Sequence, residues 1–234
     1  MAKTQCAVCN RNVENEYLKH GNKPPFKDKN ADNPINPLCR IHKRKKNKPA
    51  QVTTFAVLAQ YNFTTDLNAT SNERNITAGI VTNGSLTSAL KASPGYATDP
   101  VLQCLPPAAT TTKALAITNA SYFQFTITPA AGKKMSFQSA VTGQELTFRA
   151  ARKNANTPTG YAVRSSIDNY AADISTADLA TAETTFATIN CDLSNAKYQN
   201  LTVPVTFRIY VYAPSATDGA DFDAITLNGF TTAG

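Results

Sequence analysis

Tryptophan is absent from the 234 residues, and histidine and methionine occur only twice each. General acid–base and nucleophilic catalysis draw on histidine more than on any other side chain. With only His20 and His42 to draw on, the sequence offers no Ser/His/Asp or Cys/His arrangement, and no pair of carboxylates stands out. We therefore predict that the protein is not an enzyme.

Long apolar runs are also missing. No stretch approaches the roughly 18 apolar residues of a membrane-spanning helix. The start, MAKTQCAVCNRNVENEY, lacks the apolar core of a secretory signal. We therefore expect synthesis in a reducing cytoplasm and no association with a membrane. In that compartment the five cysteines are poor candidates for disulfide bonds.

The positive charge is concentrated in the first fifth of the chain. Residues 1–50 hold twelve Lys and Arg against four Asp and Glu, a net charge of +8, whereas residues 51–234 hold eleven against twelve, a net charge of −1. The composition changes at the same place, from Lys, Asn and Pro to Thr, Ala, Val and Phe. We predict a small basic domain over 1–50 and a large domain over 51–234.

Four metal-ligating side chains in the small domain have the spacing of a zinc site. They form C-x2-C followed, after 29 residues, by C-x2-H: Cys6, Cys9, Cys39 and His42. Two ligand pairs of this kind build a closed tetrahedral site for structural Zn²⁺, with no position left open for catalysis. A proline-rich segment of this size buries too small a core to fold alone, so a metal would supply the missing stability. The alternative is a set of unrelated free or buried thiols.

The ligand pairs in CAVC and PLCRIHKRKK resemble treble-clef zinc knuckles, including those of HNH-type phage and bacterial proteins. The resemblance covers about forty residues. An HNH nuclease also needs a histidine general base and ligands for a catalytic metal. Because the proposed zinc site uses His42, only His20 is left, and the resemblance implies a structural metal rather than nuclease activity.

A dense run of cations surrounds and follows the second ligand pair. It consists of Arg40, Lys43, Arg44, Lys45, Lys46 and Lys48. Such a run can dock on an acidic protein surface, end a helix in solvent or neutralise nucleic-acid phosphates. We favour docking on a protein, because a nucleic-acid-binding run usually interleaves aromatic side chains and this domain offers only Tyr17 and Phe26.

The large domain consists of short segments in which apolar and polar residues alternate, the pattern of half-buried strands. In residues 203–212, Val203, Val205, Phe207, Ile209 and Val211 are expected on one face. Residues 121–128 and 145–150 alternate in the same way. We expect further strands near 53–62, 75–82, 134–139, 160–166, 184–190 and 222–228, and a short helix over 175–184.

Many short strands separated by Gly- and Pro-containing turns are typical of a β-sandwich. We predict a mainly β fold, a jelly-roll-like antiparallel β-sandwich preceded by the small zinc-knuckle module. Cys104 and Cys191 are expected to be small buried residues of its core.

Four segments of the large domain carry a second resemblance: YFQFTITPAAGKKMSF, GYAVRSSIDNY, VTFRIYVYAP and DFDAITLNGF. They are similar to the carbohydrate-binding-like jelly-roll sandwich domains of exported bacterial and cyanobacterial proteins. The similarity runs from about Tyr61 to Phe230 in the same order. It implies a fold and display on a surface, but no reaction.

Two weaker patterns can be interpreted as binding sites of the sandwich. Asp218, Asp221 and Asp223 lie in a Gly-containing segment and could hold Ca²⁺, although a solvated turn explains them equally simply. Several tyrosines could stack on sugar rings or pack on the sheets: Tyr161, Tyr170, Tyr198, Tyr210 and Tyr212. We favour packing for the tyrosines and the solvated turn for the carboxylates.

A display-type sandwich, no export signal and a cationic zinc-bound module occur together in virion proteins, which are made in the cytoplasm and exposed after lysis. The whole chain resembles the head decoration, or cement, proteins of tailed phages that infect cyanobacteria. The resemblance implies a structural virion protein on the outer capsid surface, bound to the major capsid protein as a homo-oligomer such as a trimer. Two alternatives remain open: a carbohydrate-binding surface module, and a cytoplasmic zinc-dependent nucleic-acid-binding protein.

Overall fold

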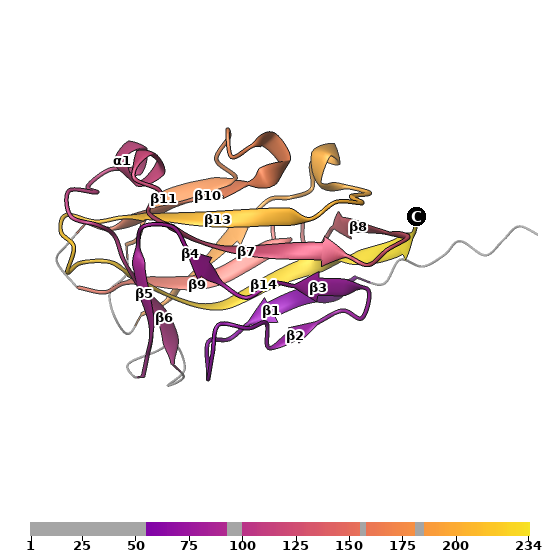
Figure 1. The fold of residues 1–234 in the computed structure, drawn as a ribbon, viewed down its shortest axis with the longest axis horizontal. Helices are drawn as coiled ribbons and strands as arrows, with labels where there is room; N and C mark the ends of the chain where they lie inside the picture. The colour runs from indigo at the N-terminus through magenta and orange to yellow at the C-terminus, as the bar shows by residue number, and fades with distance from the viewer. Residues whose placement is uncertain (1–54, 93–99, 155–157, 181–184) are drawn as a thin grey trace, which may run out of the picture. The chain divides into compact units, whose positions relative to one another are not determined.

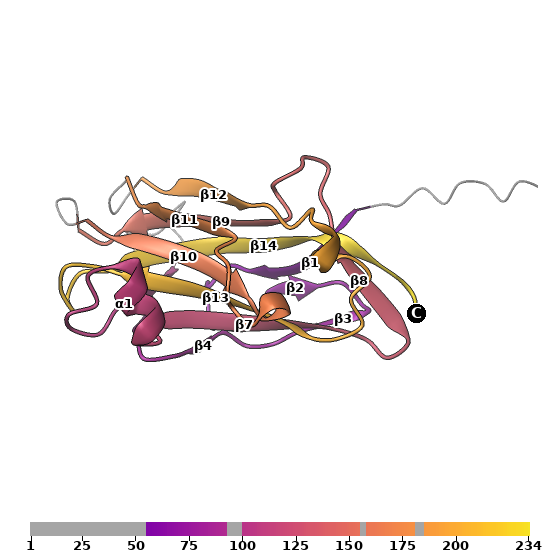
Figure 2. The same ribbon diagram turned by 90° about the horizontal axis from the view of Figure 1, so that it is seen from above.

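The computed structural model describes residues 55–92, 100–154, 158–180 and 185–234. These residues form two antiparallel β-sheets that lie face to face (Figures 1 and 2). We name each sheet after its central strand. The prediction of a mainly β antiparallel sandwich is confirmed.

The β14 sheet has eight strands, in the order β12-β9-β14-β1-β2, with β6 and β8 also paired to β14 and β5 paired to β6. Their bounds are β1 Ala56–Tyr61, β2 Ser71–Asn72, β5 Thr87–Lys91, β6 Val101–Leu105, β8 Lys133–Phe137, β9 Leu146–Arg152, β12 Ala187–Cys191 and β14 Ala220–Ala233.

The β13 sheet has six strands, in the order β11-β10-β13-β7-β3, with β4 also paired to β7. Their bounds are β3 Ile76–Ala78, β4 Thr82–Asn83, β7 Tyr122–Pro129, β10 Gly160–Ser165, β11 Ser175–Asp178 and β13 Val205–Tyr212. The chain passes repeatedly from one sheet to the other, as in a jelly-roll connection.

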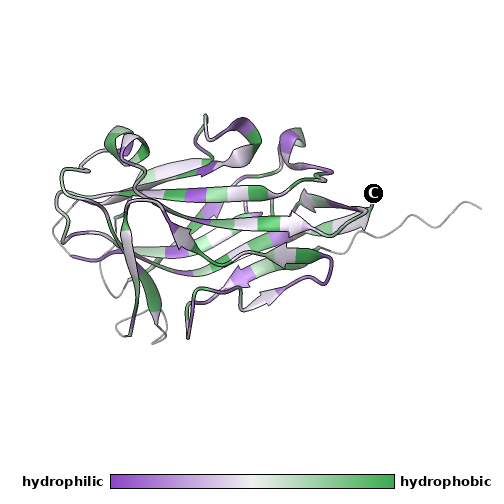
Figure 3. Cartoon of the chain, in the orientation of Figure 1, coloured by the Kyte–Doolittle hydropathy of each residue, from purple (hydrophilic) through white to green (hydrophobic). Residues whose placement is uncertain are grey.

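Hydrophobic and hydrophilic residues alternate along several strands (Figure 3). This alternation places the large apolar side chains in one buried core between the sheets. In β7, Phe123, Phe125 and Ile127 are buried, while Tyr122, Gln124 and Thr126 are only partly buried. Aromatic rings meet across the two layers: Phe123 contacts Phe222 with centroids 5.0 Å apart, and Phe137 contacts Phe207 at 5.5 Å. These edge-to-face pairs are among the favourable geometries of aromatic rings.

A short helix and two turns lie on the outer side of the β13 sheet. Helix α1, Lys113–Thr118, begins after Thr112, whose side chain accepts a hydrogen bond from the Leu115 amide. Its buried Ala116 packs on Ala162 and Tyr210 of the sheet. The single-turn helices η2, Ser166–Asp168, and η3, Ala196–Tyr198, follow β10 and β12. In Figure 1 all three stand on the β13 side of the sandwich.

The expected helix over 175–184 is wrong where the structure describes it. Residues Ser175–Asp178 form β11, which pairs with β10 from Gly160↔Asp178 to Val163↔Ser175. The Thr176 hydroxyl also donates to the Tyr161 carbonyl at 2.9 Å. This pairing overrides the helix propensity of a segment rich in Ala, because propensity is a weak preference beside tertiary contacts.

Other expectations are confirmed with shifted ends. The predicted strands appear as β1, β3, β7, β8, β9, β10, β12, β13 and β14. Val203, which we expected on the buried face of the 203–212 strand, precedes β13 and is 55% exposed. Cys104 and Cys191 are buried free thiols, as predicted. None of the described helices is long and apolar enough to span a membrane.

Candidate ligand-binding face

Three polar side chains form a row across the outer side of the β13 sheet. In the strand register, Arg164 of β10 lies opposite Arg208 of β13, and Arg208 lies opposite Gln124 of β7. Their neighbours along the strands, such as Phe125, Phe207 and Ile209, point into the core. Alternation therefore directs this row to the outside of the sandwich.

Two tyrosine rings enclose the guanidinium of Arg208. The Arg208 Cζ atom lies 4.2 Å from the ring centroid of Tyr122 and 3.8 Å from that of Tyr170. The Arg208 Nε group donates to the Gln124 Oε1 atom at 3.0 Å. A cation between two rings is stabilised by both π-systems and is held in one plane. We call Tyr122, Gln124, Arg164, Tyr170 and Arg208 the Tyr–Arg face.

Tyr170 reaches Arg208 from a loop with an unusual backbone. Asn169 and Tyr170 have φ angles of 55° and 59°, in the left-handed region. Asparagine tolerates this region, whereas tyrosine adopts it at a cost of about 1 kcal/mol or more. Hydrogen bonds hold the loop: the Tyr170 amide donates to the Ser165 carbonyl, and Arg164 Nη1 donates to the Tyr170 carbonyl at 2.8 Å. The fold thus maintains a strained residue whose ring covers Arg208.

One carboxylate ties this loop to helix α1. The two Asp173 carboxylate oxygens lie 2.6 Å from Arg164 Nε and 2.6 Å from Lys113 Nζ. Partial burial raises the pKa of Asp173, but the hydrogen bonds and charges of Lys113 and Arg164 outweigh burial and bring that pKa below its ordinary value. Asp173 therefore remains ionised and shares its charge between two cations.

Arg208 is not neutralised in the same way. Within the described ranges no carboxylate forms an ion pair with Arg208, and its Nη1 and Nη2 groups donate to no protein atom there. Asp173 thus pairs with two cations, Lys113 and Arg164, while Arg208 has no such partner among the described residues. The face carries a net charge of +2, and the like charges of Arg164 and Arg208 stand directly opposite each other across two strands.

A pocket lies on the outer side of the β14 sheet. It has a volume of about 520 Å³ and is lined by Gln144, Thr147, Arg149, Thr188, Asn190 and Thr226, among others. The neighbouring β14 strand shifts register between Asp223 and Thr226, where Ala224 has a φ of 49°. Its lining is mainly amides and hydroxyls, without the ring-enclosed cation of the Tyr–Arg face.

The structure does not test most of the sites predicted from the sequence. The zinc ligands Cys6, Cys9, Cys39 and His42 lie outside the described residues. So does the basic run of Arg40, Lys43, Arg44, Lys45, Lys46 and Lys48. These assignments stay predictions.

The three aspartates proposed for Ca²⁺ do not form one cluster. In the described part of the chain no three His, Cys, Asp or Glu side chains are placed to hold a metal ion. The solvated turn is also wrong, because Asp221 and Asp223 lie in β14 and are 0% and 4% exposed, and Asp218 is only 8% exposed. Asp218 accepts hydrogen bonds from Asn154 and Ser215.

The tyrosine candidates divide into two groups. Tyr161, Tyr198 and Tyr210 are at most 3% exposed, which confirms packing for these three. Tyr170 and Tyr212 are partly exposed, and Tyr170 belongs to the Tyr–Arg face. The alternation of residues 121–128 puts Tyr122 on the polar side of its strand, but it does not connect Tyr122 with Arg208, since their pairing depends on strand register.

No protein-family model and no curated protein sequence matches this chain. Among solved structures, the CBM22-1 and GH10 modules of xylanase 10B from Clostridium thermocellum are similar over 76% of this chain and 29% of that one, with 12% identity and a TM-score of 0.41. The CBM22-1 xylan-binding domain of Xyn10C from Paenibacillus barcinonensis is similar over 76% and 96%, with 11% identity and a TM-score of 0.39. The mannan-recognising module TmCBM27 has 9% identity and a TM-score of 0.39. TM-scores this low transfer neither ligand nor activity to this chain.

Proposed function

We propose that the sandwich is a non-catalytic module that binds a glycan on the Tyr–Arg face. The observation that carries the proposal is the placement of partly exposed tyrosine rings beside planar hydrogen-bonding groups on one open sheet surface. The loop of Tyr170 adopts a strained backbone in this arrangement. Strain of this kind gathers at functional sites, because the surrounding structure must maintain it.

The chemistry of a sugar ring matches this surface. One side of a pyranose presents C–H groups, which pack on an aromatic ring, while its edge carries hydroxyls that need donors and acceptors. Tyr170 and Tyr122 supply rings, and Gln124 and Arg208 supply an amide and a guanidinium in hydrogen-bond contact with each other. A few polar groups fixed on an apolar support are what orient a ligand.

The proposed module has no catalytic role. The charged groups of the face are the cations Arg164 and Arg208, and the two oxygens of the adjacent Asp173 are engaged by Lys113 and Arg164. A general acid or base must be free to exchange a proton with the substrate. Asp173 is already committed to two ion pairs, so binding alone accounts for the arrangement.

The test is binding of the full chain to a panel of immobilised polysaccharides. Tyr170→Ala should weaken binding to the preferred polymer about tenfold, as expected for loss of one stacked ring. Thr188→Ala, on the outer side of the β14 sheet, is the matched control and should bind like the wild type. Failure of the wild-type protein to retain any polysaccharide, or equal binding by Tyr170→Ala, would refute the proposal.

The roles predicted for the first fifty residues are separate proposals. Elemental analysis should find about one zinc per chain, which Cys39→Ser should remove if Cys6, Cys9, Cys39 and His42 form the site. Capsid decoration predicts a stoichiometric band of about 25 kDa from purified phage particles. A glycan-binding sandwich is compatible with decoration, because a head protein can carry an outward binding module.

A further inference from the structure

We propose that the Tyr–Arg face selects acidic sugars, and that the end of the Arg208 side chain binds the carboxylate of a uronic acid residue. This inference rests on the proposed glycan binding and specifies the class of ligand. The feature that carries it is the Arg208 guanidinium, which contacts Tyr122, Tyr170 and Gln124 but has no carboxylate partner within the described residues.

The first step concerns which part of Arg208 remains for a ligand. The ring centroids of Tyr122 and Tyr170 lie 4.2 and 3.8 Å from its Cζ atom, and Gln124 accepts from Nε. A carboxylate can bind an arginine through Nε and one Nη, or through both Nη groups. Because Nε already donates to Gln124, the arrangement leaves the two Nη groups, whose parallel N–H bonds fit the two oxygens of a carboxylate.

The second step concerns charge. Arg164 lies directly opposite Arg208 in the register of β10 and β13, and like charges in this position destabilise a sheet. Asp173 pairs with Arg164 and Lys113, and Arg208 remains without an ion pair among the described side chains. A bound carboxylate would reduce the surplus charge of the face from +2 to +1.

The third step concerns preorganisation. An exposed arginine must give up side-chain freedom when it binds a ligand, which reduces affinity. Here the stacked rings and the Gln124 hydrogen bond already fix the plane of the guanidinium, and Arg164 fixes the Tyr170 loop through the Tyr170 carbonyl. The side chain of Arg208 has therefore already lost its conformational freedom in the folded protein, and a ligand binds a pair of donors in a fixed orientation.

A carboxylate on a sugar ring suits the surface better than a bare anion. The Tyr170 ring lies 3.8 Å from the Arg208 Cζ atom, so a sugar ring that carries a carboxylate can contact the tyrosine and the guanidinium together. A polymer of phosphate or sulfate groups without stacked sugar rings would interact with the charge of Arg208 but not with the tyrosine ring. The inference therefore predicts preference for polyuronates over both neutral polysaccharides and other polyanions.

The experiment measures binding of the full chain to polygalacturonate and alginate, to neutral polymers of the same length, and to single-stranded DNA. The wild type should bind a polyuronate about tenfold or more tightly than its neutral counterpart, as one bidentate charged pair provides. Raising the salt concentration should narrow the difference. Arg208→Gln should abolish the preference, so that a polyuronate and its neutral counterpart bind with equal affinity, and Arg208→Lys should restore only part of it.

Arg149→Gln is the matched control, because it removes the same charge from the outer side of the β14 sheet. It should keep the preference for polyuronates. Thermal melting of each variant checks that the sandwich still folds, and the preference of the wild type is measured whether or not a variant folds.

The outcomes separate this inference from the proposed function. Tyr170-dependent binding with equal affinity for neutral and acidic polymers would overturn the acidic preference and leave glycan binding standing. Absence of binding to every polysaccharide would overturn both. Binding to DNA as tight as to polyuronate, or a preference that Arg149→Gln removes and Arg208→Gln does not, would also overturn the assignment to Arg208.

Discussion

On the outer sides of the two sheets, folding shifts the pKa of an aspartate in opposite directions. On the β13 sheet, Lys113 and Arg164 both pair with Asp173, and the pKa of Asp173 lies below its ordinary value. On the β14 sheet, Asp221 is fully buried, and burial raises its pKa even though Gln103, Lys91 and Lys153 lower it in part. Asp221 Oδ1 accepts from Gln103 at 3.1 Å, while Oδ2 lies 3.6 Å from Lys91 Nζ.

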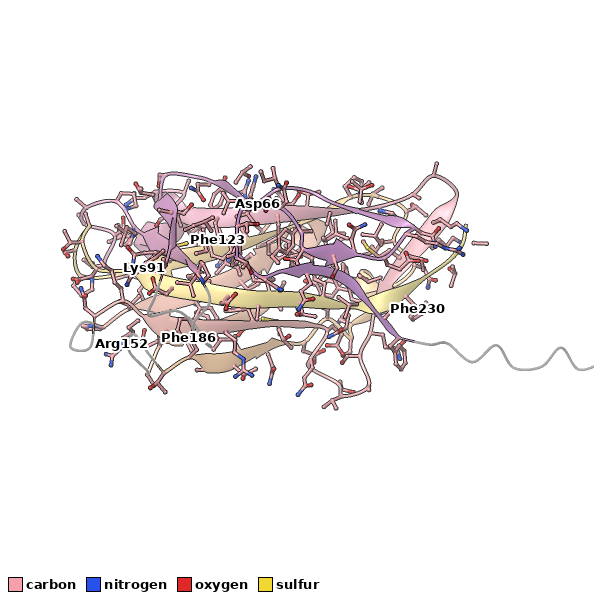
Figure 4. The ribbon with its side chains drawn as sticks, turned by 90° about the horizontal axis from the view of Figure 1, so that it is seen from below. Asp66, Lys91, Phe123, Arg152, Phe186 and Phe230 are labelled. Carbon is pink, nitrogen blue, oxygen red and sulfur yellow. The ribbon has the colours of Figure 1, made fainter. Side chains whose placement is uncertain are left out.

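This difference shows that an ion pair near a sheet does not by itself identify a binding surface. Lys91 and Asp221 form a long ion pair, with Nζ and Oδ2 3.6 Å apart, at an end of the sandwich where Arg152 and Phe186 also lie (Figure 4). Arg208, in contrast, is oriented by its neighbours and lacks a carboxylate partner within the described residues. A cation that is held in place but not neutralised is the stronger indication of a ligand.

The largest expected effect removes the core that supports both sides. Phe207 is fully buried, and its ring meets Phe125 at 5.7 Å and Phe137 at 5.5 Å. Phe207→Ala should lower the free energy of unfolding by about 3–5 kcal/mol, measured by urea denaturation. Val203→Ala, at a 55% exposed position, should change it by less than about 0.5 kcal/mol. Similar losses for the two variants would mean that the sheets do not pack as described.

A second, smaller effect is expected on the β13 side. Asp173→Asn removes the charge that holds Arg164 and Lys113, and leaves Arg164 opposite Arg208 without its counter-ion. The free energy of unfolding at pH 7 should fall by about 1–2 kcal/mol, a value reduced for the partial exposure of these groups. Arg208→Gln in the same background should recover part of the loss, because it relieves the repulsion. A double variant less stable than the sum of its parts would contradict this view of the face.

The strands could be predicted from the sequence because their signal is local. Phe123, Phe125 and Ile127 alternate with Tyr122, Gln124 and Thr126 along β7, and burial follows that period. The short strands β5 and β6 and helix α1 went unpredicted, since their segments show little alternation. The helix predicted over 175–184 was wrong at 175–178, because these residues favour a helix by themselves but form a strand by pairing with β10.

The Tyr–Arg face could not be predicted, because three separate segments create it. Arg164 meets Arg208 only through the register of β10 and β13, and no sequence pattern specifies that register. Tyr170 reaches Arg208 through a left-handed backbone at a residue type that rarely adopts it. Tyr170 was one of five tyrosine candidates in the sequence, but nothing local distinguished it from the buried Tyr161.

The pH dependence of stability should separate the two carboxylates. The pKa of Asp173 is lowered by folding, so its contribution is present above the unfolded value of about 4 and is lost as the pH falls through the folded value. The difference in unfolding free energy between wild type and Asp173→Asn should therefore shrink as the pH falls from 7 to 3, measured by urea denaturation. A constant difference over that range would show that Asp173 does not interact with Lys113 and Arg164 as described.

The smallest effect, of opposite sign, is expected at Asp221. Folding raises the pKa of Asp221, so the cost of its buried charge is present above the folded pKa and disappears as the pH falls below the unfolded value of about 4. Asp221→Asn keeps an oxygen to accept from Gln103 but removes that cost. The partly exposed Lys91 would turn toward water, so its loss of a partner should matter little.

At pH 7, Asp221→Asn should therefore raise the free energy of unfolding by up to about 1 kcal/mol, since a neutral amide is less costly to bury than an ionised carboxylate. The gain should vanish as the pH falls well below 4, where the wild-type carboxyl is protonated in both states. Gln103→Ala serves as the control, because it leaves the charge and removes its hydrogen-bond donor, and it should destabilise. If Asp221→Asn instead destabilised the protein as strongly as Asp173→Asn, the pair with Lys91 would be worth more than burial costs. The contrast between the two outer sides would then be lost.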